Sequence, residues 1–505
     1  MRGTKMPPEQ KVYDYKQDAV RDSIVGAFRK RKGEATIADI VAFTALPRYQ
    51  VETELPAVAD EYGGRLKVTD SGDILYSFPR GFVSRYRGFG PAFKRFLKAA
   101  GKVVRSVSAF LFKVWIMVML VGYFALFVAL AVLALLASVA ASSAGGERSS
   151  RSRGREGGLG GVMFATRLID IIIRIWFYNE VFKSPGQRRY ETDLRARKRE
   201  NRRPLSRAIF SFVFGEPDPN AKHDEVQKKA FLALVRVKKG VILLEDFMSI
   251  TGLSPADAET AINRYLYEFE GIPEVSGNGT VYYRFPGLMK RARSDEAGLA
   301  DSPMAKVRPF SANAPKANRS YALINGVNLL FGSYFLYCSL ALGYNMPDVV
   351  GGGTYLYWFV LSLLAQVGLN PLLVSSLVLG VVPLVFSLLF WLVPAIRAGR
   401  LKAENERIKT ENLRRVLYAQ AAANPSTLRA PDPSALPESA RPANAKAGVK
   451  VLEELAAYEG GEPLAGGEAW RMAELERKLA DVATVRDSVN LDDYRLGGTV
   501  FDTES

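Results

Sequence analysis

The 505-residue sequence predicts a mainly α-helical membrane protein that carries two small soluble α/β modules. The prediction rests on two nearly charge-free stretches, one internal repeat, and Lys and Arg clusters beside the apolar stretches. Residues 107–141 contain a single charge, Lys113, and residues 321–396 contain only Asp348. About 20 apolar residues in a helix match a hydrocarbon core about 30 Å thick. Both regions are therefore expected to cross a membrane.

The soluble modules are predicted from an ungapped internal repeat. Residues 29–79 align with residues 236–286 at a constant offset of 207, and 15 of 51 positions are identical. Random matching would give about three identities, so the repeat indicates a duplication. The shared positions include Gly33/Gly240, Asp39/Asp246, Glu52/Glu259, Gly64/Gly271, Tyr76/Tyr283 and Phe78-Pro79/Phe285-Pro286.

The order of elements within one copy predicts the fold of the module. Apolar residues at helical spacing indicate a helix over 15–31, a short helix over 37–44 and a third helix after Pro47. Two alternating runs, 65–69 and 74–78, flank a polar turn, as in a β-hairpin. A helix, a helix-turn-helix and a hairpin in this order are typical of a winged helix.

Pro56 conflicts with the third helix of the first copy, because proline inside a helix costs about 3 kcal/mol. Two explanations are open: the helix is kinked, or it starts later than the pattern indicates. The second copy has Asn263 at this position and raises no such difficulty.

The charge of the modules argues against DNA binding. Residues 14–79 hold nine Lys and Arg against eleven Asp and Glu, and residues 222–286 hold eight against nine. DNA affinity depends largely on cations that neutralise phosphates. The basic run Arg29 to Lys32 is an exception that also suits a helix C-terminus. Protein–protein recognition is therefore the preferred use of the modules, and DNA is an unlikely partner.

Basic residues collect beside the predicted spans. Residues 80–113 hold nine Lys and Arg and no acid. Such residues remain cytoplasmic and are attracted to anionic lipid, by about 1 kcal/mol each near the surface. They mark either a lipid-docking surface or topology alone. The predicted membrane-surface residues are Arg80, Arg85, Arg87, Lys94, Arg95, Lys98, Lys102 and Arg105.

Two further apolar segments have more than one interpretation. Residues 162–182 form either a second pass or an interfacial helix, and Asp170 and Arg174, four apart, are predicted to pair within it. We favour a pass, because it leaves both modules in one compartment. Residues 354–369 are short and follow a Gly-rich run, so we favour a re-entrant segment over a full span.

The scarcity of reactive side chains limits the chemistry available to the chain. Its only cysteine is Cys338, inside an apolar stretch, and its only histidine is His223, beside Lys222 and Asp224. Zinc and iron–sulfur sites normally need several such ligands. We therefore predict a protein that is not an enzyme, with no catalytic residues, cofactor or metal.

The predicted organisation has ten parts. Within the last, Met472, Leu475, Leu479 and Val482 follow a 3-4-3 spacing, which indicates a coiled-coil segment or a helix that docks on the basic surface. The parts are module 1 (14–80), a basic juxtamembrane segment (81–113), the first membrane region (114–182, with its span at 114–140), a basic connector (183–221), module 2 (222–288), a linker (289–320), the second membrane region (321–396, with clear spans at 321–345 and 371–396), a basic helix (397–422), a Pro/Ala linker (424–447) and an acidic helical tail (449–505).

The segment from Ala208 to Asn220, with its FSFVFGEPDPN motif, is not explained by periodicity. Together with Val281-Tyr-Tyr-Arg-Phe-Pro286, it resembles a family of uncharacterised multi-pass membrane proteins from cyanobacteria and chloroplast envelopes. The resemblance covers roughly residues 14–400 and implies an architecture. Some members carry a label for iron–sulfur cluster assembly, which a single cysteine within a span does not support chemically.

We therefore expect a multi-pass protein of a bacterial inner membrane, with both modules in the cytoplasm, acting as a scaffold or adaptor. The expected partners are an anionic bilayer and an unidentified protein, and self-association into a homo-oligomer is compatible with the sequence. The bacterial origin follows from the acidic tail and from several acids near the start of the chain, which are atypical of a transit peptide. The alternatives are a membrane-tethered transcriptional regulator and a transporter or channel subunit with regulatory modules.

Overall fold

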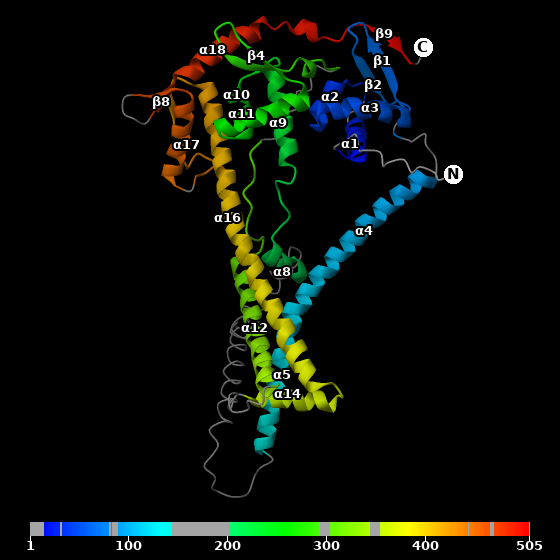
Figure 1. The fold of residues 1–505 in the computed structure, drawn as a ribbon, viewed down its shortest axis with the longest axis vertical. Helices are drawn as coiled ribbons and strands as arrows, with labels where there is room; N and C mark the ends of the chain where they lie inside the picture. Colours follow the sequence, from blue (N-terminus) through cyan, green and yellow to red (C-terminus); the bar gives the residue numbers. More distant parts are fainter. Residues whose placement is uncertain are drawn as a thin grey trace, which may run out of the picture. The chain divides into compact units, whose positions relative to one another are not determined.

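The computed structural model describes residues 15–30, 33–79, 82, 89–143, 203–292, 303–343, 354–442, 444–464 and 469–503 (Figure 1). The chain divides into two compact units. The strand-containing unit comprises Met1–Phe96, Asp218–Arg308 and Lys402–Ser505, and the apolar unit comprises Leu97–Pro217 and Pro309–Leu401. Over the described ranges the protein is mainly helical, with short strands in three small sheets, all within the strand-containing unit.

The apolar unit contains helices that could span a membrane, as the sequence predicted. Among the described residues, three helices are long and apolar enough to cross a membrane: Val103–Ala140, Pro315–Leu342 and Pro371–Ala423. The helical elements are α4 (Phe89–Met117), η1 (Val118–Gly122), α5 (Tyr123–Ser143), α8 (Leu205–Phe214), α12 (Pro315–Gly343), α14 (Tyr355–Gln366), α15 (Pro371–Leu373), η4 (Val374–Val381) and α16 (Val382–Ala423), whose last turns belong to the other unit.

The short segment between the last two spans is the helix α14. Its 12 residues rise about 18 Å, less than the thickness of a hydrocarbon core. This length fits a segment that does not cross the bilayer by itself. The predicted second pass at 162–182, with Asp170 and Arg174, lies outside the described residues.

Two buried asparagines on α12 connect it to neighbouring helices of the apolar unit. Asn328 Nδ2 donates to the carbonyl of Leu120 at 2.8 Å, and Asn325 Nδ2 donates to the carbonyl of Ser387 at 2.9 Å. Leu120 lies in η1, a π-helical segment. Such segments disturb the regular helical bonding of the backbone, so an outside donor can be accommodated there.

The Phe-rich half of the segment from Ala208 to Asn220 lies in α8, and Arg397 binds the end of this helix. Its guanidinium donates to the carbonyls of Phe212 at 2.8 Å, Val213 at 3.2 Å and Phe310 at 2.6 Å. Phe212 and Val213 lie in the last turn of α8, where carbonyls lack partners within the helix and a cation is favourable. Arg397 therefore fixes the end of α8 against the segment that leads into α12.

The strand-containing unit begins with helices α1 (Gln17–Lys30), α2 (Ile37–Thr44) and α3 (Arg48–Tyr62), followed by strands β1 (Arg65–Thr69) and β2 (Ile74–Ser77). We call these elements stretch 1. Helix α3 starts at Arg48 and runs through Pro56, so the explanation of a later start is wrong. The Pro56 side chain is exposed, which keeps the proline ring away from the core.

Stretch 2 has the same order of three helices and a hairpin, and it adds a short strand, β3, where stretch 1 has only the isolated bridge between Ala35 and Tyr76. It comprises α9 (His223–Val237), β3 (Val241–Ile242), α10 (Leu244–Thr251), α11 (Pro255–Phe269), β4 (Ile272–Val275) and β5 (Val281–Arg284), followed by the 3₁₀ turn η2 (Pro286–Leu288). Helices α10 and α11 and strands β4 and β5 begin at the positions that the sequence repeat aligns with the starts of α2, α3, β1 and β2. The strand register also agrees, because Leu66 faces Tyr76 as Pro273 faces Tyr283.

A third arrangement of this kind follows α16, where the sequence predicted a linker and a helical tail. Stretch 3 comprises the end of α16, β6 (Leu428–Arg429), α17 (Ala445–Tyr458), β7 (Gly461–Pro463) and β8 (Ala469–Met472). Its strand order, β6-β8-β7, matches the order β3-β5-β4 of stretch 2. Turns replace the short helix. Helix α17 takes the place of α11, and both have a capping side chain, Asn444 or Ser254.

The chain then continues through α18 (Ala473–Ser488), the 3₁₀ turn η5 (Leu491–Tyr494) and β9 (Thr499–Asp502), which we call the tail.

Three asparagine side chains hold the extended segment 305–308 within the strand-containing unit. Each accepts a hydrogen bond from the backbone N–H of one residue of the segment and donates one to the carbonyl of the same residue. Asn412 pairs with Ala305, Asn405 with Arg308 and Asn220 with Lys306, at distances of 2.8–3.0 Å. Asn220, the last residue of the FSFVFGEPDPN motif, thus has a structural role.

A glycine at the start of each hairpin packs closely on the preceding helix. A Cβ on Gly64 would lie 3.1 Å from Ala59 Cα, one on Gly271 would lie 2.5 Å from Leu266 Cδ2, and one on Gly461 would lie 2.7 Å from Ala456 Cβ. No side chain fits in these positions without movement of the core.

We expect Gly271→Ala to lower the free energy of unfolding by about 1–3 kcal/mol, because the added methyl overpacks the core against Phe285 and Leu266. The measurement is thermal or denaturant unfolding of the full chain in detergent. Gly277→Ala is the matched control, since a Cβ there meets no atom within 4 Å. Equal stability of the two variants would contradict the packing described.

Candidate protein-interaction site

The third helices of stretches 1 and 2 pack against neighbouring parts of the strand-containing unit. The rings of Tyr49 on α3 and Tyr267 on α11 lie 5.4 Å apart, and Arg48 Nε lies 2.9 Å from Glu270 Oε2. Near the start of α11, Glu259 accepts a hydrogen bond from the Tyr458 hydroxyl of α17 at 3.3 Å. Residues on the helices that would enter a DNA groove in a winged helix are therefore used in protein contacts.

Stretch 1 also binds the segment that follows the hairpin of stretch 2. Asp39 Oδ2 accepts from the backbone N–H of Ala292 at 2.9 Å, and Thr36 Oγ1 donates to the carbonyl of Lys290 at 3.0 Å. The Lys290 ammonium lies 3.0 Å from Asp73 in the first hairpin turn. These contacts join segments that are distant from each other in the sequence.

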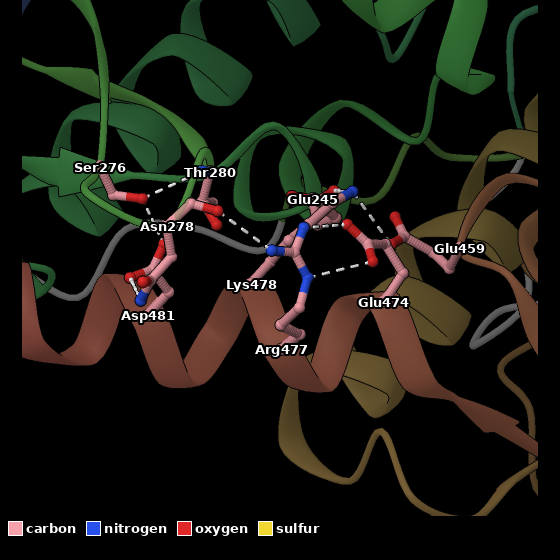
Figure 2. Close-up of polar contacts among 9 residues, drawn as sticks. All are labelled: Glu245, Ser276, Asn278, Thr280, Glu459, Glu474, Arg477, Lys478 and Asp481. Carbon is pink, nitrogen blue, oxygen red and sulfur yellow. Dashed lines mark hydrogen bonds and ion pairs between the residues drawn. The ribbon is translucent and has the colours of Figure 1, made fainter.

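Stretch 2 has a corresponding surface, which α18 covers (Figure 2). We call it the tail seat. It consists of Val241, Leu243, Glu245, Asp246, Tyr282 and the hairpin turn 276–280, together with Glu459 at the end of α17. Val482 of α18 is fully buried against Val241, Leu243 and Tyr282. The apolar part of the seat is therefore small.

Charged pairs hold α18 on both sides of this apolar contact. The Lys478 ammonium lies 2.8 Å from Glu245 Oε1 and 3.2 Å from Glu459 Oε2. Further along the helix, Arg486 Nη2 lies 2.6 Å from Asp246 Oδ2, and its Nε donates to the carbonyl of Val241 at 3.0 Å. All three acidic side chains are almost fully buried, and a buried carboxyl group is unfavourable in its ionised form unless a cation pairs with it.

Burial and the nearby Glu245 carboxylate raise the pKa of Glu459 to about 8, although Lys478 acts in the opposite direction. The pKa of Lys478 is also raised: burial acts to lower it, but Glu245 and Glu459 outweigh burial. One cation is thus shared by two close acids, an arrangement that favours keeping a proton on Glu459.

The hairpin turn of stretch 2 supplies neutral contacts to α18. The Asp481 carboxylate accepts hydrogen bonds from the Ser276 hydroxyl and, at 2.9 Å, from Asn278 Nδ2 (Figure 2). The hydrogen bonds from Ser276 and its neighbours lower the pKa of Asp481. Arg477 also donates to the carbonyl of Asn278 at 3.2 Å.

The end of the tail adds a strand to the sheet of stretch 1. Strand β9 pairs antiparallel with β1, and Val68 faces Phe501. Backbone bonds join Asp70 to Gly498 at 2.9 Å and Thr503 to Leu66 at 3.2 Å. The Val500 and Phe501 side chains are exposed, so main-chain bonding provides most of this contact.

Of the predicted site residues, only Arg105 has a side chain that the structure describes. Arg105 is exposed, while Lys94, Arg95, Lys98 and Lys102 lie on α4 and their side chains are outside the described part of the chain. Arg80, Arg85, Arg87, Asp170 and Arg174 also fall outside it. The membrane-surface role and the intramembrane pair therefore remain predictions.

The sequence analysis missed the tail seat. The 3-4-3 pattern was interpreted as a coiled coil or as a helix for a basic surface, whereas α18 presents Lys478 and Arg486 to acids. The only hint in the sequence of α18 was that Lys478 and Arg486 flank the apolar residues Leu479 and Val482, which is typical of a helix that binds an acidic surface. Their acidic partners come from distant parts of the sequence and could not be found by spacing.

Among the described residues, no group of His, Cys, Asp and Glu side chains is placed to hold a metal ion. Cys338 is buried in the apolar unit. His223 lies 3.4 Å from Arg415, and burial together with this guanidinium lowers its pKa.

These observations define a mainly helical protein with candidate membrane spans and a strand-containing unit built on intramolecular protein contacts. The chain is 23% identical over 425 residues to an uncharacterised chloroplastic protein of Arabidopsis thaliana; the alignment covers 80% of this chain and 73% of that protein. This similarity agrees with the chloroplast-related part of the resemblance noted in the sequence. No family model and no solved structure matches the chain.

We expect Glu459→Gln to flatten the pH dependence of stability between pH 5 and 8. The folded pKa of Glu459, about 8, lies above its ordinary value of 4.5. Its contribution to stability is therefore complete below pH 4.5 and is lost as the pH rises through about 8, by up to about 1.4 kcal/mol per unit. The measurement is the unfolding midpoint of both proteins from pH 5 to 9 in detergent. A constant difference between them across this range would contradict the assignment.

Proposed function

We propose that the protein is a non-enzymatic membrane scaffold or adaptor whose winged-helix modules bind other proteins. The observation that supports this most is the use of module surfaces, twice within one chain, to bind distant protein segments. Stretch 1 binds residues 290–292 and β9, and stretch 2 binds α18.

The modules themselves are part of the proposal. Stretches 1 and 2 have the same order of helices and hairpin strands and the same strand register, and one constant sequence offset relates their equivalent positions. This agreement supports a duplicated winged helix. The matching strand order of stretch 3 supports a third copy in which turns have replaced the short helix. Three copies that contact one another would form a stacked array, in which terminal repeats are commonly atypical.

The packing of α3 and α11 weighs against the alternative of a membrane-tethered transcriptional regulator. Glu54, at 1% exposure, pairs with Arg21, and Glu268 pairs with Lys228 at 2.6 Å. Neither helix presents a row of cations for phosphates, because its basic residues are matched with acids.

We place the protein in a bacterial inner membrane with its modules in the cytoplasm. The support is the excess of Lys and Arg beside the candidate spans, which favours the cytoplasmic side and contact with anionic lipid.

Affinity purification tests the scaffold role. The tagged full chain, cross-linked in membranes and solubilised in detergent, is expected to retain specific proteins in stoichiometric amounts. The control carries Phe231→Ala and Phe247→Ala, which remove fully buried rings from the core of stretch 2 and should leave the spans intact. Recovery of no protein, or of the same proteins by both chains, would contradict the proposal.

Electrophoretic mobility shift with genomic fragments tests the regulator alternative. We expect no sequence-preferring shift at about 150 mM salt, because the near-neutral modules release few counterions. Binding that weakens steeply with salt and prefers one sequence would instead support the regulator.

A further inference from the structure

We infer that the tail seat is a binding site for an amphipathic helix of a partner protein, with two basic residues eight positions apart, and that α18 is its tethered occupant. This inference rests on the proposed protein-binding function and specifies the partner of one surface. It follows from the charge of the seat, the form of its occupant and a second use of the same surface in stretch 1.

The charge of the seat determines what can bind there. Glu245 is 4% exposed, Asp246 is 3% exposed and Glu459 is fully buried. Within stretch 2, Lys238 also lies 3.6 Å from Asp246. Because a buried carboxylate without a cation is strongly unfavourable, an occupant that supplies cations is favoured. Lys478 and Arg486 do so in α18, at opposite ends of the contact (Figure 2 shows the Lys478 end).

The occupant contributes little apolar surface between its two cations. Leu479, Val482 and Val485 follow Lys478 at one, four and seven positions, which places them on one helix face. Only Val482 among them is fully buried. Helix α18 is held in addition by the contacts of Arg477 and Asp481 with the hairpin turn and by the buried Leu475. Another helix with the same two cations and aliphatic stripe can make the contacts with Glu245, Asp246 and Val241.

The corresponding surface of stretch 1 also binds a distant segment. Asp39 and Asp246 occupy equivalent positions of the repeat, and in each the Oδ2 atom accepts the backbone N–H three positions earlier at 3.0 Å. The same oxygen then accepts the incoming segment, from Ala292 N–H in one stretch and from Arg486 in the other. Two segments of different sequence are thus bound at equivalent surfaces. This indicates that the surface, and not the particular sequence of α18, determines binding.

Peptide binding to the full chain in nanodiscs tests the inference. The double variant Lys478→Glu, Arg486→Glu should release α18, because it places acids against the seat. A fluorescent peptide of residues 473–489 should then bind saturably by anisotropy, at least tenfold more tightly than it binds the wild type, whose seat is occupied. A peptide with the same two reversals should bind the variant at least tenfold more weakly.

The matched control is Arg429→Glu, Arg495→Glu, which makes the same charge change at two exposed side chains outside the seat. This control should bind the peptide no better than the wild type. The variant Lys478→Gln, Arg486→Gln repeats the test should charge reversal unfold the chain, with unfolding midpoints compared for every protein.

Absence of peptide binding to both released variants, or equal binding to the wild type, would overturn the inference. Since the probe is a synthetic peptide, this outcome is separate from the co-purification result. A scaffold that retains partners but whose seat rejects the peptide would bind those partners at another surface.

Discussion

Pairing of buried acids with cations from distant segments is the constraint on which the strand-containing unit depends. Glu245, Asp246 and Glu459 are buried where the tail covers stretches 2 and 3, and the tail supplies Lys478 and Arg486. Without the tail, stretches 2 and 3 would therefore expose these acids or take up protons. The same logic operates in stretch 1, where Glu54 is buried and meets Arg21. Charge pairing thus specifies which segments assemble, while the apolar cores supply most of the stability.

Patterns local in the sequence predicted most of the architecture. Charge-free runs identified the helices that could span a membrane, because a hydrocarbon core tolerates few other sequences. Periodicity and the constant offset of the repeat located α2, α3, β1 and β2 and their counterparts almost to the residue. Pro56 was a local conflict that the helix resolves by leaving the proline on its exposed side. Helices and strands were predicted correctly where the residue pattern that determines them lies within the element itself.

Features that depend on distant partners could not be predicted. Stretch 3 was not recognised as a sheet-containing element because its strands are very short and Pro and Ala dominate the segment before α17. Strand β9 pairs with β1, although more than 400 residues separate them in the chain, and the sequence of neither strand indicates its partner. Acidic residues that appeared to be surface charges, such as Glu245 and Glu459, are buried because the tail covers them.

The sheet of stretch 1 has a consequence for how the protein is made. Strands β1 and β2 emerge early in synthesis, yet their third strand, β9, lies close to the C-terminus. All three candidate spans lie between them in the chain. The sheet can therefore be completed only after all three of these helices have been synthesised.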